Sequence, residues 1–385
     1  MLLAILLATP AHAGPVFASV DPEITIGRGG TWSRTLPSAD GWWFMQASGG
    51  DFWADAVAID FSGYDDQNRT QLSDHGGLQD VQVERCDDGR FLVLGSATID
   101  QFDDSAYAFW SNADLSRAAT VVVEEREDAR AHNDMAPVCS GGFEGVAYSV
   151  GRGGGPGGSM FFEIGPDAVG ATHTIDFNAM GGALAVRPSD GRLIGLDAAS
   201  DDVGSLRFTV FAEDWSVAER FTAPVPVGFA SWPQRLLPFG DGWLVTYVAN
   251  PDRVARGGEG DVWVVALDAD FTIRDSIQVT PTGTIGGRPW VSRNGDVLAV
   301  SYDREVQPRV TLVRLETDAV PDGEDLPDTA APDDDDDDRD TGAGAPGACG
   351  CASSGASAGV WALALAFAAL GRRAQRFSRI QSTMA

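Results

Sequence analysis

Lysine is absent from the sequence, so all 27 basic residues are arginines, against 56 aspartates and glutamates. The formal net charge is −29 at pH 7. An acidic segment, residues 318–340, accounts for −11 and four arginines near the C-terminus add +4, so the rest of the chain carries −22. The negative charge is therefore spread over the whole chain, which argues against a basic patch for nucleic acid or anionic lipid.

Catalytic motifs are also missing. The sequence has no Gly-x-Ser-x-Gly elbow and no zinc-protease, phosphate-loop, dinucleotide-binding or EF-hand motif. The glycine-rich stretch 151–158 lacks the Lys-Ser/Thr ending of a phosphate loop, so we interpret it as a flexible loop. We predict no catalytic residue, no metal centre and no cofactor, although aspartate pairs such as Asp65-Asp66 could bind Ca²⁺ weakly.

Helical patterns are scarce, whereas strand-like alternation, glycine and aromatic residues recur along the chain. A turn glycine followed by a hydrophobic strand occurs six times, with spacings of 48, 53, 49, 51 and 53 residues. These glycines are Gly41, Gly89, Gly142, Gly191, Gly242 and Gly295. Four strands in about 50 residues are typical of one propeller blade, so we predict an all-β, six-bladed β-propeller.

Further strands follow each glycine in the same order. Predicted third strands are Asp55–Ile59, Ala106–Trp110, Met160–Ile164, Leu206–Phe211, Val262–Leu267 and Val310–Leu315, and predicted fourth strands are Ala119–Val123, Ala171–Ile175, Val217–Thr222 and Ile273–Val279. The sixth unit lacks a fourth strand, and Val20–Ile26 resembles Leu267–Ile273, the segment that it needs. We expect this N-terminal strand to close a propeller spanning residues 14–317, because closure removes an exposed sheet edge. Two stacked β-sandwiches, the alternative, would need neither the regular spacing nor an orphan strand.

Two of the four cysteines occupy equivalent positions in the repeat. Cys86 and Cys139 each lie three residues before a turn glycine, in the second and third units. In an oxidising compartment they could form a disulfide closing a loop of about 53 residues, worth roughly 3 to 4 kcal/mol. Equivalent sites of neighbouring blades can lie too far apart for this bond, so two buried thiols are the alternative.

The N-terminus indicates export. Residues 1–13 combine an apolar run with Ala11-His12-Ala13, the small-x-small pattern of a signal-peptidase site, but without a basic first region. We predict a signal peptide that is cleaved after Ala13. A buried N-terminal strand is the alternative.

The C-terminus combines four features in a fixed order. An acidic linker, residues 318–348, leads to Cys349-Gly350-Cys351, then to an uncharged apolar stretch, Ala356–Gly371, and then to an arginine cluster. The stretch lies at the short end of the roughly 17 to 25 residues that span a bilayer as a helix. Arginines after the span predict a cytoplasmic C-terminus. An amphipathic helix packed on the domain would instead carry polar residues with a 3.6-residue period.

This tail, residues 349–385, resembles the MYXO-CTERM sorting signal, in which a Gly-Cys-type motif precedes one transmembrane helix and an arginine cluster. The resemblance implies recognition by a membrane protease of the myxosortase type and placement on the cell surface or outer envelope. It also implies that a cysteine, Cys349 or Cys351, is processed or anchored. The expected partners are therefore signal peptidase, this sorting protease and the membrane, and no nucleic acid.

In a propeller, the loops between second and third strands and the connections between blades share one rim, and ligands usually bind at such a concave mouth. The candidate ligand-binding residues on this rim are His75, Asp80, His132, Asp134, Trp232, Arg235, Arg288 and Trp290. Aromatic faces with Asp and Arg would suit a sugar, whereas His75 and His132 with Asp134 or Asp80 could hold a metal. The histidines could instead cap strand ends, and Arg235 and Arg288 could form salt bridges between blades.

Three functions are compatible with these features. The first is a surface-anchored, non-catalytic module that binds a glycan or a protein. The second is an extracellular polysaccharide hydrolase or lyase, which would need two facing carboxylates at the mouth, one of them with a raised pKa. The third is a structural envelope protein.

Overall fold

The computed structural model describes residues 14–26, 31–48, 51–62, 64, 70–71, 78–98, 104–114, 116–126, 135–149, 159–179, 181–198, 204–250, 259–283, 286–304 and 307–320. Apart from one short 3₁₀ helix, η1 (Thr317–Ala319), the regular elements in these ranges are β-strands. The all-β prediction is therefore confirmed for this part of the chain. The predicted signal peptide, and the linker and sorting tail from residue 321 onward, lie outside it.

The strands between Thr31 and Gln278 form consecutive antiparallel groups of four, which we call blades 1 to 5. Blade 1 is β3 (Thr31–Ser38), β4 (Gly41–Ser48), β5 (Asp51–Ala58) and β6 (Thr70–Gln71); blade 2 is β7 (Leu78–Arg85), β8 (Phe91–Thr98), β9 (Asp104–Ser111) and β10 (Arg117–Arg126); blade 3 is β11 (Met135–Ser140), β12 (Phe143–Ser149), β13 (Ser159–Ile164) and β14 (Val169–Ile175); blade 4 is β15 (Ala183–Val186), β16 (Leu193–Ala198), β17 (Ser205–Phe211) and β18 (Val217–Pro224); blade 5 is β19 (Phe229–Phe239), β20 (Gly242–Asn250), β21 (Glu259–Leu267) and β22 (Ile273–Gln278).

Blade 6 combines both ends of the described chain. Its first strands are β23 (Gly286–Asn294), β24 (Val297–Arg304) and β25 (Gln307–Leu315), and its outer edge is made by β1 (Phe17–Val20) and β2 (Ile24–Thr25), which both pair antiparallel with β25. Closure by the N-terminal segment is therefore confirmed, but the single closing strand expected at 20–26 is wrong. The strand begins earlier and is interrupted at residues 21–23, where Pro22 has no N–H to donate. Arg314 holds Asp21 at 3.1 Å and Arg304 holds Glu23 at 3.1 Å.

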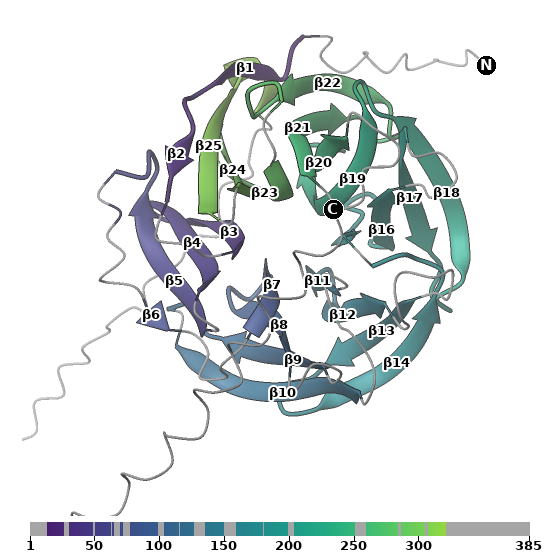
Figure 1. The fold of residues 1–385 in the computed structure, drawn as a ribbon. Helices are drawn as coiled ribbons and strands as arrows, with labels where there is room; N and C mark the ends of the chain where they lie inside the picture. The colour runs from purple at the N-terminus through teal and green to yellow at the C-terminus, as the bar shows by residue number, and fades with distance from the viewer. Residues whose placement is uncertain are drawn as a thin grey trace, which may run out of the picture. The chain divides into compact units, whose positions relative to one another are not determined.

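The six blades follow one another around a ring (Figure 1). Each first strand contacts the first strand of the next blade, and β23 of blade 6 contacts β3 of blade 1, so we call these the inner strands. Two residue pairs between β21 and β23, Glu259 with Gly287 and Gly260 with Gly286, also join blades 5 and 6 into one sheet. A separate hydrophobic cluster lies between every two neighbouring blades, including 6 and 1. This arrangement is a closed β-propeller and does not fit two stacked sandwiches.

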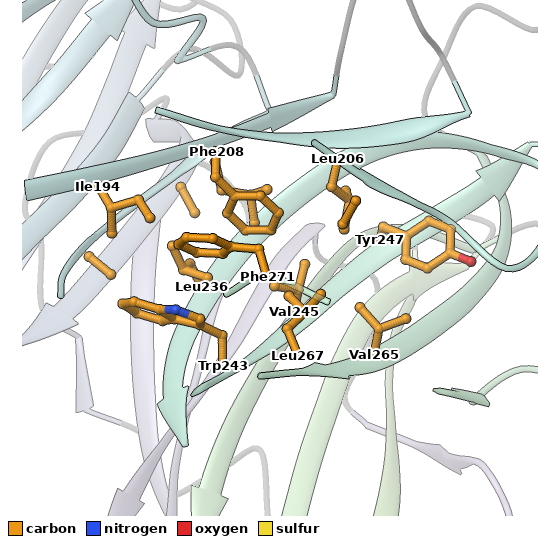
Figure 2. Packing of buried hydrophobic residues seen from close by; sticks show 14 of the residues in the cluster. Ile194, Leu206, Phe208, Leu236, Trp243, Val245, Tyr247, Val265, Leu267 and Phe271 are labelled. Carbon is orange, nitrogen blue, oxygen red and sulfur yellow. The ribbon is translucent and has the colours of Figure 1, made fainter. Parts of the chain in front are cut away.

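Figure 2 shows the cluster between blades 4 and 5, where side chains from β16 and β17 meet those from β20 and β21. Phe271, which follows β21, lies with its ring 4.5 Å from that of Phe208 and 4.8 Å from that of Phe221. Trp243 is also buried in this cluster. Burying an aromatic side chain of this size contributes about 1.5 to 3 kcal/mol relative to exposure, so packing between blades supplies much of the stability of the ring.

Phe271 belongs to a turn that recurs between third and fourth strands. Its backbone is left-handed, with φ of 64°, and the carboxylate of Asp270 accepts a hydrogen bond from the backbone of Thr272 at 3.1 Å. The same arrangement recurs at Asp60-Phe61-Ser62 and Asp214-Trp215-Ser216. A left-handed backbone at an aromatic residue raises the conformational energy by roughly 1 to 2 kcal/mol. Burial of the aromatic ring against the preceding blade offsets this cost. This Asp-aromatic-Ser/Thr pattern is visible in the sequence but was not among the predicted features.

Cys86 and Cys139 form a disulfide with a Cα–Cα distance of 4.6 Å, so that prediction is confirmed. Cys86 directly follows β7 and Cys139 lies in β11, and these are inner strands of neighbouring blades. The two sites are close because neighbouring inner strands approach each other near the axis, where the circumference of the ring is smallest. The backbone N–H of Gly141 also donates to Asp87 at 2.8 Å, which strengthens the same connection between blades 2 and 3.

Candidate functional site

Four of the six inner strands contain a β-bulge, and the bulges lie in the first part of each strand. The pairing register shifts between Thr31 and Arg34 in β3, Gln79 and Gln82 in β7, Ser231 and Arg235 in β19, and Gly287 and Trp290 in β23. The pairing of β11 and β15 with their neighbours is regular. Bulges turn side chains away from the normal alternation and are frequent next to functional sites. The four bulged strands therefore define the candidate site, which we call the axial cluster.

Arg34 lies at the centre of the axial cluster, with a residue exposure of 0 %. Its Nε donates to Gln82 Oε1 at 3.1 Å, and its Nη2 donates to Gln234 Oε1 at 3.2 Å. Its Nη1 donates to the backbone oxygen of Ser33 at 2.8 Å. One side chain of blade 1 thus connects blades 2 and 5 through hydrogen bonds across the axis.

Arg235 and Glu84 form an ion pair inside the cluster. Arg235 Nη2 donates to Glu84 Oε1 at 2.8 Å, and its Nη1 donates to the other carboxylate oxygen. The pair joins β19 of blade 5 to β7 of blade 2, which stand on opposite sides of a six-membered ring. Burial lowers the pKa of Arg235 to about 10, so its guanidinium stays protonated at neutral pH.

Trp290 packs against both buried arginines. The guanidinium carbons of Arg34 and Arg235 lie 4.9 and 4.6 Å from its ring centroid, at cation–π distance. Its indole N–H donates to the backbone oxygen of Thr35 at 3.0 Å. The indole ring, which is 1 % exposed, therefore fixes the positions of both charged groups.

Arg288 lies at the edge of the cluster and is partly exposed. Its Nη1 donates to Asp303 Oδ2 at 3.4 Å, and Ser33 donates to the other oxygen of the same carboxylate at 3.5 Å. Its backbone is left-handed, with φ of 53°, and the next residue is Pro289. A non-glycine residue in this region is held there by its surroundings, commonly at a binding or catalytic site.

Two buried donors of the cluster have no acceptor among the residues that the structure describes. They are Gln234 Nε2, in a residue that is 3 % exposed, and Arg235 Nε, in a residue that is 9 % exposed. A buried donor without a partner costs about 1 to 3 kcal/mol. Such groups usually bind a water molecule or a ligand.

The remaining inner strands are apolar over the corresponding positions. In β11 the residues Met135, Ala136 and Val138 are buried, and in β15 the residues are Ala183, Leu184 and Ala185. Met135 and Leu184 lie seven residues before their turn glycines, as Arg34, Gln82, Arg235 and Arg288 do in the bulged strands. Met135 packs in the hydrophobic cluster between blades 2 and 3, and Leu184 in the one between blades 3 and 4. The polar side chains described for the axial cluster therefore come from blades 1, 2, 5 and 6.

The structure brings together some of the residues predicted from the sequence. Arg235 and Trp290 are in the axial cluster and Arg288 is at its edge, while the backbones of Asp80 and Trp232 lie within bulges. The side chains of those last two residues lie outside the described part of the structure, as do His75, His132, Asp134, Cys349 and Cys351.

Four residues of the axial cluster were not predicted from the sequence: Arg34, Gln82, Glu84 and Gln234. Arg34 and Gln82 could have been found from their place in the repeat, seven residues before a turn glycine. Arg235 and Arg288 were expected to form salt bridges between blades. Arg235 does so, because its pair with Glu84 joins blade 5 to the opposite blade 2. The pair that Arg288 forms with Asp303 instead lies within blade 6.

A separate groove of about 390 Å³ lies at the outer edge of blades 5 and 6. It is lined by residues 20–23, which connect β1 and β2, and by residues 278–282, which end and follow β22. Its two carboxylates, Asp21 and Glu23, are held by arginines of blade 6. The groove therefore lies where the N-terminal strands close the ring, at the outer strands of blades 5 and 6 and not at their inner strands.

One buried carboxylate has a raised pKa, but it is held in a structural pair. Burial raises the pKa of Asp197 against the opposing effect of Arg207, which binds both of its oxygens at 2.8 Å. Asn178 also donates to it from the backbone at 3.1 Å. Among the described residues, no group of three His, Cys, Asp or Glu could hold a metal ion. The described residues also contain no helix long and apolar enough to cross a membrane.

No family model matches the sequence, and no curated protein matches it. Several solved structures are similar in fold at low identity. A protein of unknown function from Bacteroides caccae has 12% identity and a TM-score of 0.42, covering 69% of this chain and 94% of that one. A subtype N10 neuraminidase-like protein of A/little yellow-shouldered bat/Guatemala/060/2010 has 11% identity and a TM-score of 0.43, covering 77% and 99%. A glucose dehydrogenase has 10% identity and a TM-score of 0.47, covering 76% and 99%. These similarities carry no argument about the function of this chain.

Proposed function

We propose that this protein is a non-catalytic binding module on the cell surface, and that its propeller takes a glycan or protein ligand at the rim where the inner strands begin. The observation that carries the proposal is the set of four bulges, which gather arginine, glutamine and tryptophan side chains at one end of the axis. A few polar groups placed on a rigid, otherwise apolar scaffold are typical of a binding site.

The carboxylates of the axial cluster favour binding over hydrolysis. A polysaccharide hydrolase needs one protonated and one charged carboxyl group facing the substrate. Glu84 is paired with Arg235 through both oxygens, and Asp303 is paired with Arg288. A neighbouring guanidinium favours the charged form of a carboxylate, so neither of these groups is suited to act as the general acid.

The same proposal includes the route to the surface. The signal peptide, residues 1–13, would export the chain, and the acidic linker, 318–348, would hold the propeller away from the membrane because like charges extend it. The apolar stretch within 349–385 would span the membrane, and a myxosortase-type protease would act near Cys349 or Cys351. Replacing each cysteine by alanine in turn, followed by mass analysis of the surface-exposed protein, identifies the one processed. Unprocessed protein recovered from the cytosol would contradict the placement.

Binding is tested with the full chain in a neutral detergent, on an array of bacterial surface glycans, with released sugar measured in parallel. We expect binding without release of sugar. Arg288→Ala should weaken binding at least tenfold, because Arg288 is the partly exposed cation of the cluster. Arg192→Ala is the matched control, since Arg192 lies at the opposite end of blade 4, and it should bind as the wild type does. Sugar release would favour the hydrolase, and absence of both binding and release would favour a structural role.

A further inference from the structure

The two buried donors without an acceptor among the described residues belong to consecutive residues, where the bulge of β19 ends. Gln234 and Arg235 are consecutive residues, and both reach other blades from there: Gln234 contacts Arg34 of blade 1, and Arg235 contacts Glu84 of blade 2. Their N–H groups, Gln234 Nε2 and Arg235 Nε, are therefore both donors of the axial cluster, and both residues are fixed by contacts with other blades.

The direction of the Gln234 amide is set by its neighbour. Arg34 has only N–H donors, so the amide must present its oxygen, Oε1, to Arg34 Nη2 at 3.2 Å. The opposite orientation would bring two donors together. The NH₂ group of Gln234 consequently points away from Arg34 and needs an acceptor of its own.

The Arg235 guanidinium leaves one edge open in a similar way. Glu84 uses both terminal nitrogens, Nη1 and Nη2, in an end-on pair. The Nε–H lies on a different edge of the planar group and is not reached by that carboxylate. The side chain is held in place by Glu84 and Trp290, so this donor cannot rotate to another partner.

We infer that Gln234 Nε2 and Arg235 Nε bind a carboxylate of the ligand, and that the ligand is an acidic glycan that presents a uronic acid residue. The inference rests on the proposed function and names its ligand class. Two N–H donors, one of them on a guanidinium, match the two oxygens of a carboxylate, and such charge-assisted bonds are about twice as strong as neutral ones. A neutral hydroxyl oxygen could also accept from these donors, but it lacks the negative charge that strengthens the bond.

The charge of the whole chain limits the kind of acidic glycan. The part outside the linker and tail carries −22, so it repels a dense polyanion, and only charges within about 8 Å are felt strongly at physiological salt. A single carboxylate delivered next to Arg34 and Arg235 is attracted locally. The expected ligand therefore carries isolated acidic residues and is not a continuous polyanion.

The test is calorimetric titration of the full chain in neutral detergent with D-glucuronate, acetate and D-glucose. We expect D-glucuronate to bind at least tenfold more tightly than D-glucose, a difference of about 1.4 kcal/mol, and acetate to compete with it. Gln234→Glu keeps an oxygen for Arg34 but replaces the NH₂ donor by a carboxylate oxygen, so it should weaken D-glucuronate binding at least tenfold. Gln278→Glu makes the same chemical change in the outer groove and is the matched control, with binding unchanged.

Each result decides the inference. Equal binding of D-glucuronate and D-glucose, equal effects of the two glutamate variants, or absence of binding by all three probes would overturn the carboxylate site. Binding of neutral glycans on the array would in that case leave the proposed function standing. A structure with D-glucuronate bound should place its carboxylate within hydrogen-bond distance of Gln234 Nε2 and Arg235 Nε, and a different position would also contradict the inference.

Discussion

The inner strands of blades 1, 2, 5 and 6 differ from those of blades 3 and 4 in one backbone feature, the bulge. In the strands with a bulge, the residue seven positions before the turn glycine is arginine or glutamine. In the two strands without a bulge, this residue is Met135 or Leu184. The comparison teaches that a polar axis in this propeller requires both the residue and the altered backbone. A polar side chain in a regular inner strand would be buried between two blades without partners.

The strongest test transfers a polar residue to the regular side. Leu184→Arg introduces an arginine seven residues before the turn glycine of β15, the place that Arg34 has in β3. Unlike β3, β15 has no bulge, and the new side chain would have no hydrogen-bond acceptor. We expect a loss of more than about 4 kcal/mol in the free energy of unfolding, because an unpaired buried charge is strongly destabilising. Urea unfolding followed by tryptophan fluorescence measures it. Leu184→Met, which conserves volume, is the control and should cost under about 1.5 kcal/mol; similar costs for both would refute the comparison.

The next test removes a charge from the bulged side. Glu84→Ala leaves the buried guanidinium of Arg235 without its carboxylate, which should cost about 3 to 5 kcal/mol. Replacing both partners by methionine should recover most of this loss, because the penalty comes from the unpaired charge. Urea unfolding of Glu84→Met, Arg235→Met and the double methionine variant gives the coupling energy. Additive losses would mean that the two side chains act independently.

The disulfide connects the two kinds of inner strand, since Cys86 follows bulged β7 and Cys139 lies in regular β11. Replacing both cysteines by serine should lower the free energy of unfolding by roughly 3 to 4 kcal/mol, mainly through the entropy of the unfolded chain. The same loss should appear when the wild-type protein is unfolded with a reductant present. An unchanged unfolding curve under reducing conditions would show that the bond contributes nothing.

The smallest effect is expected at the turn between β15 and β16 on the regular side. Hydrogen bonds from Arg187 lower the pKa of Asp190 below its usual 3.8. A lowered pKa in the folded state stabilises the protein above pH 3.8, and this contribution disappears as the pH falls through the folded-state value. Asp190→Asn should therefore cost under about 1 kcal/mol at pH 7 and nothing in strong acid. A constant difference between the two proteins from pH 7 to pH 2.5 would contradict the assignment.

Several features of the fold could be predicted because they repeat. The turn glycines mark the blades, and the missing fourth strand after Leu315 points to closure by the N-terminus. The equivalent positions of Cys86 and Cys139 in neighbouring units suggested a disulfide but left two buried thiols as the alternative, and the structure shows the bond. The exact closing strand was not predicted. Pro22 marks the interruption in the sequence, but the arginine contacts of Asp21 and Glu23 appear only in the three-dimensional structure.

The candidate site could be predicted only in part. Arg235, Arg288 and Trp290 stand out in the sequence as charged or aromatic residues at the start of a predicted strand, but Gln82 and Glu84 look like ordinary exposed residues of an alternating strand. The spacing from glycine to glycine ranges from 48 to 53 residues and does not distinguish units with a bulged inner strand from units with a regular one. No local sequence pattern therefore predicts which side chains of an inner strand join the axial cluster.

By itself the sequence determined the all-β class and the six units, since each depends on a pattern that repeats along the chain. It offered Cys86 and Cys139 as a possible pair, and the structure shows the bond between them. Only the tertiary structure decided which residues meet at the axis. Closing six blades into a ring places blade 2 opposite blade 5, so Glu84 and Arg235, far apart in the sequence, come within bonding distance. Contacts across the axis depend on the geometry of the complete ring, and no single repeat contains that information.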